Sequence, residues 1–108
     1  MHIICSSETK LGTVTIQIWA IIPPTGKRKM IGKSGNLEFG KDEQPEMFSE
    51  FEVEWDNRWD LSARCPALSL TKQVSLHSKT KSVLINVRDS IYGPQLEIQQ
   101  NTKELVRG

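Results

Sequence analysis

Nine acidic side chains gather in one stretch of this chain, where carboxylates could bind a cation or a basic partner. Residues 38–60 hold nine of the thirteen Asp and Glu residues but only two of the fourteen Lys and Arg residues, a formal charge of −7. The other residues sum to +8, so the net charge of +1 conceals an acidic centre between basic flanks. Charges sorted in this way either neutralise each other inside the fold or form opposed surfaces that recruit partners.

The most regular carboxylate pattern is SEFEVEW, residues 49–55. In an extended chain Glu50, Glu52 and Glu54 share one face, about 7 Å apart, while the apolar residues between them share the other. Such a row either pairs with Lys or Arg on neighbouring strands or forms a docking face. The candidate basic neighbours are Lys27, Lys29, Lys79, Lys81 and Arg88.

The residues after this row could anchor a partner. Arg58 can pair with Asp56 or Asp60 and stack on Trp59, and Trp and Arg are over-represented among the residues that dominate interface energies. Closure of the core edge is an equal alternative for Trp59. The predicted partner-binding set is Glu50, Glu52, Glu54, Arg58 and Trp59.

A basic segment offers an alternative surface for anions. It follows a Pro-Pro-Thr-Gly turn and comprises Lys27, Arg28, Lys29 and Lys33. It could contact the phosphates of nucleic acid or an anionic membrane in a salt-dependent manner. A P-loop is excluded, because Lys27 stands where that motif requires glycine. A third alternative is a carbohydrate-binding sandwich that uses Trp19 or Trp59.

The cysteines and histidines form no catalytic or metal-binding pattern. Cys5 or Cys65 could act with His2 or His77, but no sequence signature accompanies them. Zinc-ligand spacing is absent. Asp56, Asp60 and the pair Asp42-Glu43 could offer oxygens to calcium, but without EF-hand spacing. We expect no enzyme, cofactor or metal, and two free thiols rather than a Cys5–Cys65 disulfide.

Short alternating segments dominate the rest of the chain and predict strands. Their ranges are 13–22, 27–31, 49–55, 67–76, 82–88 and 96–98, with 36–39 as a hairpin partner of 27–31. Lys72 interrupts an apolar face, which indicates an edge strand or a bulge. Residues 59–66 are expected to be irregular or a single helical turn. The predicted fold is all-β, a single-domain antiparallel β-sandwich of six to eight short strands, with a small β-barrel as the alternative.

The length of 108 residues predicts one domain, residues 1–108, with mobile ends at 1–9 and 100–108. No signal peptide or membrane-spanning apolar run is recognised, so we expect a cytoplasmic or host-intracellular protein.

The expected function is a non-enzymatic protein-interaction or self-assembly module. The acidic face would bind a basic surface on a protein partner or on a second copy of the chain. With acidic and basic surfaces on separate parts of the molecule, self-assembly would run head to tail and build rings or filaments.

Overall fold

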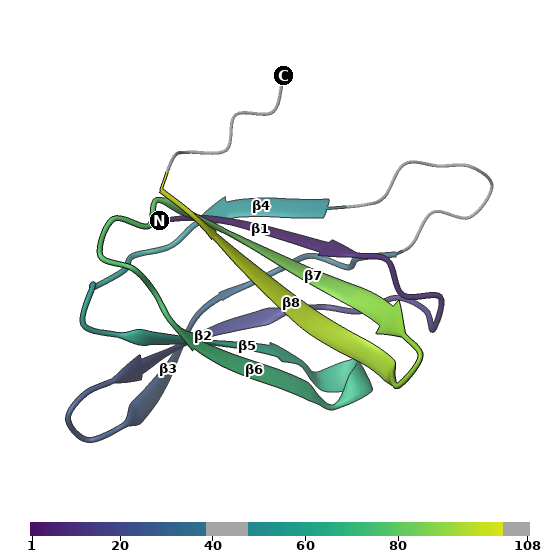
Figure 1. Ribbon diagram of the computed structural model, residues 1–108, viewed down its shortest axis with the longest axis horizontal. Helices are drawn as coiled ribbons and strands as arrows, with labels where there is room; N and C mark the ends of the chain where they lie inside the picture. The colour runs from purple at the N-terminus through teal and green to yellow at the C-terminus, as the bar shows by residue number, and fades with distance from the viewer. Residues whose placement is uncertain (39–47, 103–108) are drawn as a thin grey trace.

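The computed structural model describes residues 1–38 and 48–102 of the chain. Within these ranges the backbone forms eight strands and one short 3-10 turn (Figure 1). The strands are β1 His2–Ser7, β2 Gln17–Ile22, β3 Lys27–Lys33, β4 Phe48–Glu52, β5 Asp60–Cys65, β6 Leu70–Ser75, β7 Ser82–Ser90 and β8 Gly93–Asn101, and the turn η1 is Pro66–Leu68. In the same ranges no helix is long and apolar enough to cross a membrane.

The strands form two four-stranded sheets that make up the two layers of a sandwich (Figure 1). The strand orders are β4-β1-β7-β8 and β3-β2-β5-β6. The pair β1–β7 is parallel, and the other strand pairs of the described chain are antiparallel. The predicted β-sandwich is therefore confirmed, and the alternative of a closed small barrel is wrong.

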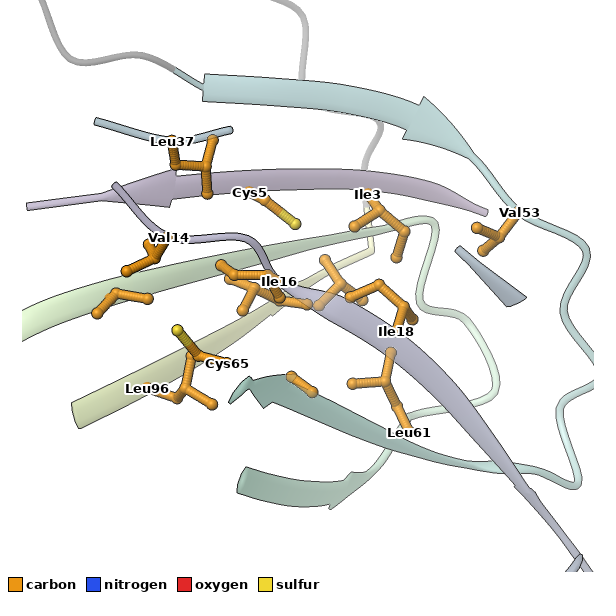
Figure 2. Close-up of a cluster of buried hydrophobic side chains, with 14 residues drawn as sticks. Ile3, Cys5, Val14, Ile16, Ile18, Leu37, Val53, Leu61, Cys65 and Leu96 are labelled. Atoms are coloured by element: carbon orange, nitrogen blue, oxygen red, sulfur yellow. The ribbon is translucent and has the colours of Figure 1, made fainter. Parts of the chain in front are cut away.

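The core lies between the sheets and follows the predicted alternation. Val14, Ile16, Ile18 and Ala20 are at most 3% exposed, so the inward face of this segment is confirmed. Ile85 on β7 is also fully buried. Figure 2 shows the buried side chains of both layers meeting in one cluster. Burial of each such aliphatic side chain contributes roughly 1.5–3 kcal/mol.

The two open sides of the sandwich are closed differently. On one side the Gln100 side chain accepts a hydrogen bond from the backbone N–H of His77 and donates one to the carbonyl oxygen of Ser75, which links β8 to the end of β6. On the other side Gly32 of β3 packs against Phe51 of β4: a Cβ at Gly32 would lie 2.6 Å from Cε2 of that ring. The C-terminal end of β3 therefore lies beneath the C-terminal end of β4, while the rest of β3 projects away with β2 (Figure 1).

Two segments differ from the sequence-based expectation. Residues 1–9, expected to be a mobile end, supply the internal strand β1 between β4 and β7. Ile4 is buried as well as Ile3 and Cys5, which hides the period of two. Asp60–Cys65, expected to be irregular, forms β5 between β2 and β6, where small inward residues such as Ala63 gave only a weak signal.

Two further expectations concern strand partners. Lys27–Lys33 pairs with β2 rather than with residues 36–39, and Leu37 forms a bridge to Val14 instead. Phe39 lies outside the described residues. The edge position expected around Lys72 is confirmed, because β6 ends its sheet.

Candidate functional site

The acidic row is split at the end of β4. This strand ends at Glu52, so Glu54 lies beyond it and the expected strand of residues 49–55 is too long. Glu50 and Glu52 point away from the core because Phe51, between them, packs against it. The Glu50 side chain is 30% exposed and that of Glu52 is 65% exposed.

A histidine and an amine contact these carboxylates. The only strand that pairs with β4 in the described chain is β1. His2 on β1 lies opposite Glu52, with Nδ1 2.8 Å from its Oε1, and places Nε2 3.4 Å from Oε2 of Glu50. The Met1 ammonium group lies 3.5 Å from Glu52 Oε2 and donates a hydrogen bond to the carbonyl oxygen of Val53. The pKa of Glu52 is lowered, mainly because its carboxylate is hydrogen-bonded to His2. The positive charge of the Met1 ammonium group makes a smaller contribution in the same direction.

Arg58 and Trp59 belong to a turn that is held by its own contacts. The Arg58 guanidinium group donates to both carboxylate oxygens of Asp56, at 3.1 and 2.8 Å, and lowers the pKa of Asp56 to about 2. Trp59 packs edge-on against Trp55, with ring centroids 5.5 Å apart. The predicted Arg58–Asp56 pair is confirmed. Trp59 is half-buried beside Trp55, as expected of a residue that closes the core edge.

The basic segment forms an edge strand that projects from the sandwich with β2 (Figure 1). The turn between them requires Gly26, whose φ of 72° is costly for other residues. Lys27, Arg28, Lys29 and Lys33 are all exposed. Among residues 1–38 and 48–102 none of these four forms an ion pair. The strand pairs only with β2 there, so its outer backbone edge is open.

The tryptophans proposed for sugar binding are not open platforms. The Arg64 guanidinium carbon lies 4.8 Å from the centroid of the Trp19 ring, and Trp19 Nε1 donates to Gln17 Oε1. Trp19 and Trp59 are both half-buried. A sugar would have to displace Arg64 to stack on Trp19.

The thiols and imidazoles do not form a reactive pair. Cys5 and Cys65 are free and fully buried, which agrees with the expectation of two thiols. Burial raises the pKa of Cys5 to about 12 and also raises that of Cys65. His2 lies on the opposite face of β1 from Cys5, and His77 is an exposed turn residue.

No group of three or more His, Cys, Asp or Glu side chains suited to a metal occurs in the described part of the chain. Asp56 is paired with Arg58, and Asp60 accepts a hydrogen bond from Ser75. Asp42 and Glu43, the other residues considered for calcium, lie outside the described residues.

Comparison of the chain with protein-family models, curated proteins and solved structures found no match. The candidate site therefore depends on geometry alone. Two of its features were missed by sequence reasoning: the contact of His2 with the acidic row, and the position of the Gly32 end of β3 beneath β4. Neither had a clear sequence signal, because the buried Ile4 hides the alternation of β1 and the second feature depends on how the sheets stack.

Proposed function

We propose that the protein is a non-enzymatic protein-interaction module that binds an acidic, extended segment along the open edge of β3. The observation that carries this proposal is the combination of an unpaired backbone edge with four exposed cations that form no ion pair in the described chain. An unpaired strand edge is a ready template for another strand.

The two parts of this edge have different roles. Backbone hydrogen bonds with an added strand would supply affinity, as in other cases of strand addition. The cations would steer an acidic segment and set its orientation, and this contribution would weaken with salt. We assign the receiving edge to β3 rather than to β4, because His2 already contacts Glu50 and Glu52 of the acidic row.

A peptide-binding experiment tests the proposal. The probe is a fluorescent peptide with the sequence of residues 48–54, FSEFEVE, and its matched version has glutamine at the three glutamate positions. We expect the acidic peptide to bind, the glutamine peptide to bind at least tenfold more weakly, and added salt to reduce the difference. Fluorescence polarisation gives the affinities, and amide chemical shifts report whether β3 is the contact.

Two triple variants of the protein serve as matched tests. Lys27→Glu/Arg28→Glu/Lys29→Glu should abolish binding, while Lys10→Glu/Lys72→Glu/Lys79→Glu changes the same charge at exposed sites elsewhere and should retain most of it. Equal losses in both variants, or no loss in either, would contradict the proposal.

A single-stranded oligonucleotide is the second probe. If it binds through residues 27–29 and the acidic peptide does not, the function is phosphate binding and the proposal fails.

A further inference from the structure

We infer that the acidic segment is supplied by a second copy of the chain and that the two copies form a closed, two-fold symmetric pair. In each copy Glu52, the last residue of β4, and Glu54, just beyond it, would face β3 of the other copy. This inference rests on the proposed function, because it identifies the partner that the edge of β3 receives.

The two charged edges share one side of the sandwich. A Cβ placed on Gly32 of β3 would lie 3.1 Å from Cγ1 of Val53 as well as 2.6 Å from the Phe51 ring. Nearby, the backbone N–H of Gly35 donates to Oγ of Ser49 on β4, at 3.3 Å. A basic strand and an acidic strand end therefore lie at the same side of one molecule, in different layers.

Within one molecule these charges point apart. Arg28 and Lys33 stand opposite Ile21 and Gln17 in the register of β2, on the outward face of their sheet. Glu52 lies on the outward face of the other sheet, and packed sheets are about 10 Å apart. The contacts of Glu52 in the described chain are with His2 and the Met1 ammonium group, not with β3.

A two-fold axis brings the opposite charges together. The axis would run parallel to the strands, just outside the edges of β3 and β4 and at a height midway between the two layers. Rotation about it places the β3 layer of the second molecule level with the β4 layer of the first. The acidic end of β4 then meets β3 of the partner, and the same contact occurs a second time by symmetry. Such an isologous contact is satisfied by two copies and does not propagate. The head-to-tail assembly expected from sequence assumed that the two charged surfaces lie apart.

Charge exchange between variants tests this pairing. The first variant carries Glu52→Lys and Glu54→Lys, and the second carries Arg28→Glu and Lys33→Glu. Each alone would place like charges at both contacts, so we expect each to sediment as the 12.3 kDa monomer. An equimolar mixture restores both contacts and should form a one-to-one pair. The wild-type protein should reach twice the monomer mass and no more as its concentration rises, and should dissociate in high salt.

Controls separate this inference from a folding defect and from the proposed function. Circular dichroism checks each variant, and Glu54→Lys alone leaves the His2–Glu52 contact intact if the double variant does not fold. Lys72→Glu/Lys79→Glu should still dimerise. A wild-type mass that keeps growing, or a mixture that stays monomeric, overturns the two-fold pair. If the wild-type chain is monomeric while the acidic peptide still binds β3, the inference fails and the proposed function stands.

Discussion

His2 stands where a lysine or arginine was expected beside the acidic row. Its two ring nitrogens lie 3.4 Å from Glu50 Oε2 and 2.8 Å from Glu52 Oε1. The pKa of Glu52 is lowered, chiefly by the hydrogen bond with His2. The stability that this contact contributes is therefore present above the ordinary pKa of the carboxyl group and is lost as the pH falls through the lowered pKa.

The buried thiols lead to a prediction about reactivity. Only a thiolate reacts rapidly with a disulfide reagent, and burial raises the pKa of Cys5 to about 12. We expect neither Cys5 nor Cys65 to react with Ellman's reagent in the folded protein at mildly alkaline pH, and both to react in denaturant. The variant Ile91→Cys, at a site that is 90% exposed, should react while folded and so controls for the assay. Rapid labelling of the native wild-type protein would show that a thiol is accessible.

At the scale of the elements, the stacking of β3 beneath β4 depends on the absence of a side chain at Gly32. Phe51 is half-buried and occupies the space that a larger residue would need. This close approach is what holds the basic edge and the acidic edge on the same side. It also makes the interface between the layers sensitive to a single methyl group.

Gly32→Ala should therefore destabilise the protein by about 1–3 kcal/mol through overpacking. The matched control is Gly35→Ala, because a Cβ there meets nothing within 4 Å. Chemical denaturation measures both. The double variant Gly32→Ala/Phe51→Leu should lose less stability than the sum of the losses of the two single variants, because the clash between the new methyl group and the Phe51 ring is removed. Equal stability of the two alanine variants would refute the close contact.

At the scale of the molecule, two sheets share one core, so the layers should unfold together. The β7–β8 hairpin provides a matched pair of isoleucines, Ile85 with 0% exposure and Ile91 with 90%. Ile85→Ala should cost about 2–5 kcal/mol, because it leaves a cavity between the sheets. Ile91→Ala should change stability by no more than about 0.5 kcal/mol. A similar small effect for both in urea unfolding would mean that the sheets do not depend on a common core.

Sequence patterns were sufficient to identify a strand and its inward face where one face is apolar and the other polar. Residues 13–22 and 82–88 show this alternation, and their inward faces are confirmed. The signal failed for β1 and β5, which are internal strands with less regular alternation. For the candidate site, the sequence identified the charged residues and the Arg58–Asp56 pair, but not the histidine between the glutamates.

The sequence by itself determined an all-β chain, two sets of segregated charges and the outward direction of Glu50 and Glu52, because period-two alternation is a local property. Only the tertiary structure decided which strands are neighbours. β1 pairs with β4 and β7, which come much later in the chain, and such pairing depends on packing the whole core. The placement of β3 beneath β4 is decided in the same way. It turns a separation of charges along the sequence into two oppositely charged edges on one side of the sandwich.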